Sequence, residues 1–295
     1  MRVFVTGASG WIGSHAVQEF LTAGHEVLAL ARSDASAAAL RARGVHVLRG
    51  DLDDLASLRE GARSTDGTVH LANKHDFTDP AASNAAERAA VQTIADELAG
   101  SDRPFLLASG LAGLGDGRLL TEDVVNPAVG PDSPRGGSER LALDYADRGV
   151  RAVAARFAPT VHGTGDHGFL AALVAAARAA GRSGYVGDGT NRWAAVHVTD
   201  AARAVRLAVE SAPAGTRLHV VAEEGIPTRD IATAIGEGLG LPVESVDPAR
   251  ATEEIGWIGF FLGLPAAASS DRTRALLDWH PTGPTLAEDL PGYLA

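Results

Sequence analysis

Short apolar runs alternate with helix-like segments through the first half of the chain. The predicted strands span residues 2–6, 26–31, 45–50, 68–72, 104–109 and 151–157. The helical segments between them include 35–44, 54–62, 81–99 and 138–148. The run EVLALA at 26–31 is continuously apolar, which is typical of a parallel strand covered on both faces. The alternation predicts an α/β fold with a doubly wound parallel sheet and helices on both faces.

The pattern changes after residue 157. A loop-rich stretch leads to a predicted helix over 169–181, where apolar residues recur at helical spacing. A strand and a helix follow over 194–210, and RLHVVA at 217–222 reads as a further strand. The tail, 223–295, is expected to hold two or three helices and short strands.

Composition and charge narrow the class of protein. The 295 residues are 45% apolar and contain no cysteine, which excludes thiolate chemistry and disulfides. The formal charge of −11 and the lack of a basic run with aromatics argue against a nucleic-acid partner. The longest apolar run, 257–268, contains Pro265 and is shorter than the roughly 20 residues of a membrane helix. The start does not read as a signal peptide, so we expect a cytoplasmic protein without a membrane partner.

The stretch TGASGWIG at 6–13 places three glycines directly after the first strand, at the start of a helix. Gly7 suits a tight turn, Gly10 allows a pyrophosphate to approach the backbone, and Gly13 lets helix and strand pack closely. The helix N-terminus offers N–H groups and a positive dipole end to phosphates. A dinucleotide site is therefore predicted here. Its remaining members are Ser9, Trp11 and Ile12.

The turn and several later segments resemble the extended short-chain dehydrogenase/reductase superfamily, which has a Rossmann fold and includes epimerases and dehydratases. RGDLDD contains a pair similar to its adenine-contacting residues, and HLA at 70–72 resembles its fourth-strand cofactor segment. RFAPTVHG at 156–163 resembles the segment that holds the nicotinamide carboxamide, and 187–205 resembles its return to the nucleotide domain. The resemblance implies these further cofactor-binding residues: Asp51, Leu52, Leu71, Ala72, Asn73, Lys74, Ser109 and Pro159.

The residues after the second strand indicate which dinucleotide is preferred. NAD sites place an acid there to bind the ribose 2′-hydroxyl, whereas an arginine suits a 2′-phosphate. Here the strand ends in Ala31, Arg32 and Ser33, and the acid Asp34 comes one residue late. We therefore predict NADP as cofactor, with NADPH preferred over NADH and bound by Arg32 and Ser33.

The Tyr-x-x-x-Lys pair of the superfamily is missing. The only lysine is Lys74, and His70 lies four positions before it. In the fifth-helix region Arg135 and Glu139 fall where the tyrosine and the lysine belong. This resembles atypical members of the superfamily. Three explanations stay open: other residues do the chemistry, the cofactor is bound without turnover, or the fold serves another reaction.

Three residues are candidates for the missing chemistry. Lys74 follows the fourth strand, where an ammonium can reach the nicotinamide ribose or the pyrophosphate, and His75 and Asp76 come next. Ser109 ends the fifth strand and can bond a substrate carbonyl. His162, in HGTGDHG, is a possible proton donor near neutral pH. No metal site is expected.

The leading hypothesis is an NADP(H)-dependent oxidoreductase acting on a small carbonyl compound or alcohol with a non-standard active site. The alternatives are an NAD-dependent epimerase or dehydratase, and a non-catalytic NADP(H) sensor. The expected division is a dinucleotide-binding domain over 1–160, to which 194–222 returns, and a smaller α+β substrate region over 161–193 and 223–295. The resemblance also implies a homodimer.

Overall fold

The computed structural model describes residues 1–74 and 79–295, so His75 and Asp76 lie outside the described residues. The chain divides into two compact units. Unit 1 comprises 1–109, 125–155 and 202–218, and unit 2 comprises 110–124, 156–201 and 219–295. The segment 194–222, expected to return to the nucleotide domain, is thus divided between the two units.

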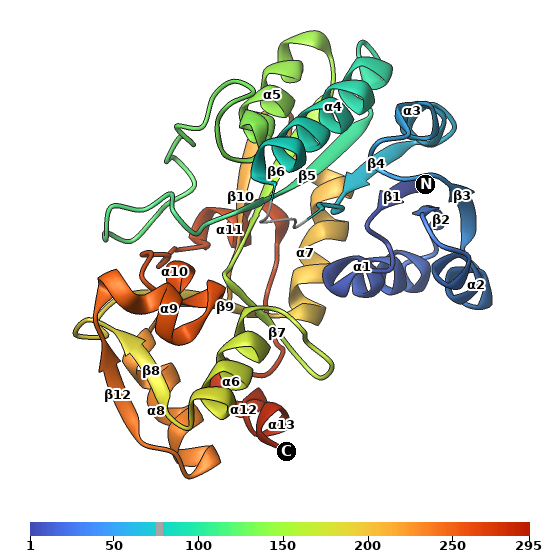
Figure 1. Cartoon of the computed structure of the whole chain (residues 1–295). Helices are drawn as coiled ribbons and strands as arrows, with labels where there is room; N and C mark the ends of the chain where they lie inside the picture. Colours follow the sequence, from blue (N-terminus) through green and yellow to red (C-terminus); the bar gives the residue numbers. More distant parts are fainter. Residues whose placement is uncertain (75–78) are drawn as a thin grey trace. The chain divides into compact units, whose positions relative to one another are not determined.

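A seven-stranded sheet in the order β10-β6-β5-β4-β1-β2-β3 organises unit 1 (Figure 1). The pairs β1–β2, β2–β3, β1–β4 and β4–β5 are parallel. The order reverses direction between β1 and β4, as in doubly wound dinucleotide-binding sheets. The strands are β1 (Arg2–Thr6), β2 (Glu26–Ala31), β3 (His46–Arg49), β4 (Gly67–His70), β5 (Pro104–Gly110), β6 (Arg151–Phe157) and β10 (Thr216–Val220), the last three of which continue into unit 2.

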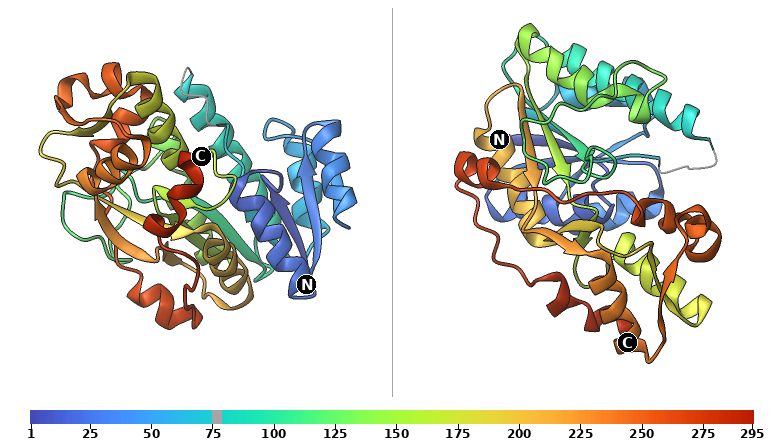
Figure 2. Two further views of the ribbon diagram at one scale, coloured as in Figure 1. Left: turned by 90° about the horizontal axis from the view of Figure 1, so that it is seen from below. Right: turned by 90° about the vertical axis from the view of Figure 1, so that its left-hand side faces the viewer.

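Helices cover both faces of this sheet, which confirms the predicted fold class. Phe4 and Leu28 belong to a core cluster with α3, α4 and α5, and alternate residues such as Val3 and Val27 are buried on the opposite face. Figure 2 shows α4 and α5 together along one face of the strands. The helices are α1 (Trp11–Thr22), α2 (Asp34–Ala42), α3 (Leu55–Arg63), α4 (Pro80–Leu98), α5 (Ser138–Asp144) and α7 (Val198–Ser211).

Several predicted elements end earlier than the pattern indicates, among them a strand and a helix of unit 1. The strand predicted over 68–72 stops at His70, because its neighbour β1 stops at the paired residue Thr6. The helix predicted over 138–148 is α-helical only to Asp144 and continues as a 3₁₀ turn to Arg148. Leu71 and Ala72 therefore lie in the loop beyond the carboxyl end of β4.

Unit 2 mixes helices with short strands. It contains a three-stranded sheet in the order β11-β9-β7, a parallel pair β12–β8, and a core cluster around Trp193. Its strands are β7 (Thr160–His162), β8 (Ser183–Val186), β9 (Arg192–His197), β11 (Glu223–Pro227) and β12 (Val243–Val246). Its helices are α6 (Phe169–Ala180), α8 (Thr228–Leu239), α9 (Ala251–Ile255), α10 (Trp257–Leu262), α11 (Asp271–Leu277), α12 (Leu286–Asp289) and α13 (Pro291–Leu294). Among the helices in the described ranges, none is long and apolar enough to span a membrane.

Candidate functional site

The glycine-rich turn joins β1 to α1 and is packed too tightly for side chains. Gly7 has a φ of +71°, and a Cβ added there would lie 2.7 Å from the Ala72 nitrogen. A Cβ on Gly13 would lie 2.0 Å from the Gly7 carbonyl oxygen. Glycine at these two positions therefore lets the turn, the start of α1 and the loop after β4 come together, as the sequence predicts.

The N-terminus of α1 suits a phosphate. Gly10 is the N-cap, and no side chain of the described residues caps this end of the helix. The first-turn N–H groups can then donate to an anion, with the helix dipole adding to the attraction. Ser9 and Gly10 are exposed, and Trp11 and Ile12 are half-buried. These residues fit the pyrophosphate of a dinucleotide.

The ends of β2 and β3 bring two arginines together. Arg32 is exposed, and its carbonyl accepts a bond of 2.8 Å from Arg49, which also pairs with Asp34. Ser33 caps α2 by accepting a bond of 3.1 Å from the Ser36 N–H. Arg49 is absent from the sequence predictions. Its place at the end of the third strand could have indicated it, because parallel pairing sets Arg49 opposite Ala31 at the end of β2.

The loop after β3 is tied to the loop after β4. The Asp51 carboxylate accepts bonds from the Asp53 and Asp54 N–H groups at 2.9 and 3.0 Å. Leu52 is buried in the core cluster. The Lys74 ammonium lies 2.8 Å from both carboxylate oxygens of Asp53. Lys74 therefore joins two loops at the carboxyl edge of the sheet, and its action on cofactor or substrate stays a prediction.

A buried carboxylate holds several groups at the end of β4. Glu87, on α4, is 1% exposed and accepts bonds of 2.7 Å from Arg135 and 3.1 Å from Asn73. His70 bonds Thr6 at 2.9 Å through Nδ1, and its Nε2 lies 3.7 Å from Glu87. Burial acts to raise the pKa of Glu87, but the charges of Arg135 and His70 and the bond from Asn73 outweigh it and lower the pKa to about 2. Glu87 is therefore ionised near neutral pH.

A second buried carboxylate lies at the end of β5. The Ser109 hydroxyl donates a bond of 2.6 Å to Glu139, on the first turn of α5. The Asn126 amide lies 3.4 Å from the same oxygen. Ser109 is 8% exposed and Glu139 is 6% exposed. The sequence predicts a role for Ser109, whereas it indicates Glu139 only as the residue at the lysine position.

A left-handed segment sets the position of α5. Arg135, Gly136 and Gly137 have φ values of 53°, 61° and 62°. Two hydrogen bonds hold this segment against α4. Asn84 accepts one of 2.9 Å from the Arg135 N–H, and Arg88 donates one of 2.7 Å to the Gly136 carbonyl. A Cβ on Gly136 would lie 2.5 Å from the Asn84 carbonyl oxygen. The glycines are therefore needed to bring Glu139 to the end of β5.

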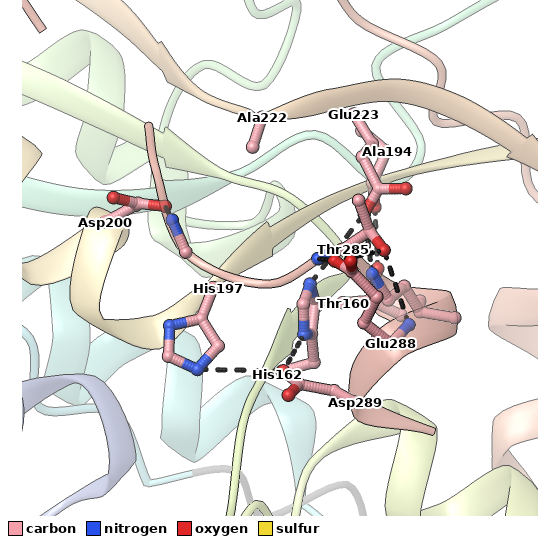
Figure 3. Close-up of polar contacts among 12 residues, drawn as sticks. Thr160, His162, Ala194, His197, Asp200, Ala222, Glu223, Thr285, Glu288 and Asp289 are labelled. Atoms are coloured by element: carbon pink, nitrogen blue, oxygen red, sulfur yellow. Dashed lines mark hydrogen bonds and ion pairs between the residues drawn. The ribbon is translucent and has the colours of Figure 1, made fainter. Parts of the chain in front are cut away.

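His162 lies in unit 2, where Figure 3 shows it beside Asp289. Its ring is fully buried. Nδ1 is 2.6 Å from Asp289 on α12, which is also 3.6 Å from His197 Nε2. The other ring nitrogen, Nε2, is 3.9 Å from Glu223. The bond to Asp289 links β7, which carries His162, to α12 near the end of the chain. The contacts of this ring are therefore structural. Donation of a proton to substrate by His162 stays a prediction.

The remaining predicted cofactor-binding residues lie in loops, and their role in binding the cofactor stays a prediction. Pro159 is half-buried between β6 and β7 in unit 2, and Leu71, Ala72 and Asn73 form the loop beyond β4 in unit 1. Within residues 1–74 and 79–295, no group of three or more histidine, aspartate or glutamate side chains is arranged to hold a metal ion.

The family follows from comparison with known sequences. A family model described as the NAD dependent epimerase/dehydratase family matches residues 3–221. The matched region begins in β1 and includes the glycine-rich turn, Glu87, Ser109 and Glu139. The chain therefore belongs to the NAD-dependent epimerase/dehydratase family, which agrees with the resemblance found in the sequence.

Relatives align along nearly the whole chain. A protein of Schizosaccharomyces pombe is 44% identical over 291 residues, and one of Saccharomyces cerevisiae is 42% identical over 294 residues. Each alignment covers 98% of both chains, and both relatives are named as uncharacterized proteins. A dihydroquinoline-oxide ketoreductase of Stigmatella aurantiaca is 28% identical, with 87% of this chain and 80% of the relative covered.

Solved structures share the fold. The dTDP-glucose 4,6-dehydratase DesIV of Streptomyces venezuelae, solved with NAD, matches with a TM-score of 0.76 at 23% identity. The match covers 100% of this chain and 96% of that one. At this identity the likeness establishes the NAD-binding fold.

Proposed function

We infer that the protein is an NADP(H)-dependent oxidoreductase that interconverts a small carbonyl compound and its alcohol. The observation that carries this proposal is that a dinucleotide-type turn and a polar side-chain network lie at the carboxyl edge of the same parallel strands. Ligands of doubly wound sheets bind at this edge. The name of the Stigmatella aurantiaca ketoreductase supports carbonyl chemistry, since the alignment with that relative covers 87% of this chain.

The cofactor supplies the hydride, and the protein supplies binding and proton transfer. The first-turn N–H groups of α1 would hold the pyrophosphate, and the loop beyond β4 borders the turn at Gly7. Ser109, at the end of β5, would bond the substrate oxygen. The tail carries no cluster of basic residues for a nucleotide-sugar diphosphate, which favours a non-nucleotide substrate.

Preference for NADPH is part of the proposal. Arg32 and Arg49 would face a 2′-phosphate beside the N-terminus of α2, where the dipole also attracts an anion. Asp34 is 99% exposed at its side chain and pairs with Arg49. The bound phosphate would therefore compete with Asp34 for the Arg49 guanidinium. Because of this competition, substitution of Asp34 should change the preference between NADPH and NADH.

Single substitutions at these positions are expected to change NADPH affinity and to leave NADH affinity unchanged. Arg32→Ala and Arg49→Ala should each weaken NADPH binding about tenfold, because each removes a charge-assisted bond. Asp34→Ala should strengthen NADPH binding by removing the competing carboxylate. Fluorescence titration with both cofactors measures the effect, and Arg41→Ala, exposed on α2, is the matched control. Equal losses for NADH and NADPH would contradict a 2′-phosphate site.

The function itself is tested by NADPH consumption. Purified protein is supplied with NADPH and a panel of aldehydes, ketones and quinones, and the loss of dihydronicotinamide absorbance is followed with product analysis. Turnover of at least one carbonyl to its alcohol is the expected result. Selective cofactor binding with no turnover across the panel would contradict the oxidoreductase proposal and favour a sensor.

A further inference from the structure

Two buried carboxylates lie at the carboxyl edge of the sheet, and their surroundings differ. Glu87 is paired with the Arg135 guanidinium at 2.7 Å and stays ionised at any physiological pH. A group of this kind anchors its neighbours and does not exchange protons near neutrality. The Glu87–Arg135 pair therefore positions the segment before α5.

Arg135 occupies the tyrosine position of the family motif but cannot replace a tyrosine in proton transfer. A guanidinium stays protonated across the range in which proteins function. Its side chain is also committed to Glu87, and its backbone N–H is bonded to Asn84. Proton exchange at this edge must therefore use another group.

Glu139 is the carboxylate in contact with the predicted substrate-binding serine. The hydrogen bond of 2.6 Å from Ser109 is directed at Glu139 Oε2 and has the usual length for a hydroxyl that donates to a carboxylate. Asn126 approaches the same oxygen at 3.4 Å, so a hydroxyl on β5 and an amide on a loop both help to orient this oxygen. Glu139 is 6% exposed, so bulk water does not surround the carboxylate. A carboxylate that accepts a hydrogen bond from a serine hydroxyl can act as a general base and take the proton of that hydroxyl.

We propose that Ser109 and Glu139 form a proton relay for the hydride transfer described under Proposed function, on which this inference rests. Ser109 is the catalytic residue, because its hydroxyl would contact the substrate oxygen. Glu139 is its positioning and proton-exchanging partner. The relay assigns to a serine and a glutamate the acid–base work that tyrosine and lysine perform elsewhere in the family.

The step balances in the direction of alcohol oxidation. The substrate O–H bond breaks and its proton passes to Ser109 Oγ, while the Ser109 proton passes to the Glu139 carboxylate. The substrate C–H bond gives its hydrogen with two electrons to the oxidised nicotinamide, and a C=O bond forms. The alcohol is oxidised and NADP⁺ is reduced. Reduction of a carbonyl reverses each transfer, starting from protonated Glu139, which solvent reprotonates after each turnover.

Four variants separate this relay from a structural role. Glu139→Gln should lower kcat by on the order of 100-fold to 10,000-fold with NADPH affinity unchanged, and Ser109→Ala should lower kcat to a similar degree. Ser109→Thr keeps a hydroxyl and should retain more activity than Ser109→Ala. Asp144→Asn is the matched control, because Asp144 lies on the same helix and pairs with exposed Arg140. Rates are measured with whichever carbonyl the wild-type protein reduces, and with the corresponding alcohol.

Two further readouts are specific to proton exchange. The pH profile of alcohol oxidation should have an acidic limb in the wild type and in Asp144→Asn that is missing in Glu139→Gln. By infrared spectroscopy without substrate, the carboxylate band assigned to Glu139 by its loss in Glu139→Gln should shift in Ser109→Ala, because the serine bonds that carboxylate.

The outcomes distinguish the relay from the proposed function. If the wild type turns over a carbonyl and Glu139→Gln matches its rate and pH profile, the relay is wrong and the oxidoreductase proposal stands. An unshifted carboxylate band in Ser109→Ala also overturns the relay. If the wild type turns over nothing in the panel, the proposed function fails, and the relay fails with it.

Discussion

Replacing Glu87 by alanine is expected to lower the free energy of unfolding by about 2 to 3 kcal/mol, because hydrogen-bond donors around a buried site lose their acceptor. The substitution leaves Arg135 and Asn73 without the carboxylate that accepts their bonds at 2.7 and 3.1 Å. It also removes the charge beside His70, whose Nε2 has no hydrogen-bond partner among the described residues. Denaturant unfolding measures the loss.

Two variants make the result interpretable. Gln92→Ala, at an exposed position on the same helix, should change stability by no more than about 0.5 kcal/mol. The double variant Glu87→Ala/Arg135→Gly should recover part of the loss, since it removes the unpaired cation and the non-glycine residue at a φ of 53°. A loss in Glu87→Ala no larger than that of Gln92→Ala would show that the buried pair does not stabilise unit 1.

The same carboxylate predicts how stability depends on pH. The folded pKa of Glu87 is lowered from 4.5 to about 2. A lowered pKa contributes stability that is present above the unfolded value and lost as the pH falls from 4.5 through 2. The contribution is about 3 kcal/mol for a shift of this size. The stability difference between the wild type and Glu87→Gln should therefore narrow over this acidic range and stay constant from pH 5 to pH 8.

Gly13→Ala is expected to be the single change most damaging to cofactor binding. The added Cβ would lie 2.0 Å from the Gly7 carbonyl oxygen, so the turn or the helix must move. Overpacking of this kind costs about 1 to 3 kcal/mol, which corresponds to a loss of about fivefold to 150-fold in affinity if the turn yields. Thermal unfolding and NADPH titration measure the two effects.

The matched control for Gly13→Ala is Gly292→Ala, where an added Cβ meets nothing within 4 Å. This variant should bind NADPH as the wild type does. Unchanged NADPH affinity in Gly13→Ala would contradict the placement of the pyrophosphate at this turn.

Local sequence signals predict the fold and the turn well. The side chains of β1 and β2 are buried on both faces of the sheet. This burial on both faces is visible in the sequence as a continuous apolar run. The role of Gly13 also follows from the sequence, because strand, turn and helix are contiguous there. Element ends were harder to place: β4 stops at His70 because of its pairing with β1, which spacing does not reveal.

Side-chain partners distant in the sequence could not be predicted. Arg135 was noted at the tyrosine position, but its partner Glu87 lies 48 positions earlier, on a different helix. The sequence indicates His162 as a possible proton donor, but it does not reveal the partner Asp289, which lies 127 residues further along the chain. Such contacts depend on how separate elements pack, and no local pattern encodes that packing.

The most direct test of the account is a titration of the protein with NADPH and then with NADH. Binding is followed by energy transfer from tryptophan to the dihydronicotinamide, to which Trp11 in the turn should contribute. The account predicts exchangeable, micromolar NADPH binding and distinctly weaker NADH binding. Preference for NADH, or a nucleotide that stays bound and does not exchange, would contradict it in favour of an epimerase or dehydratase. Binding of neither cofactor would contradict the dinucleotide site itself.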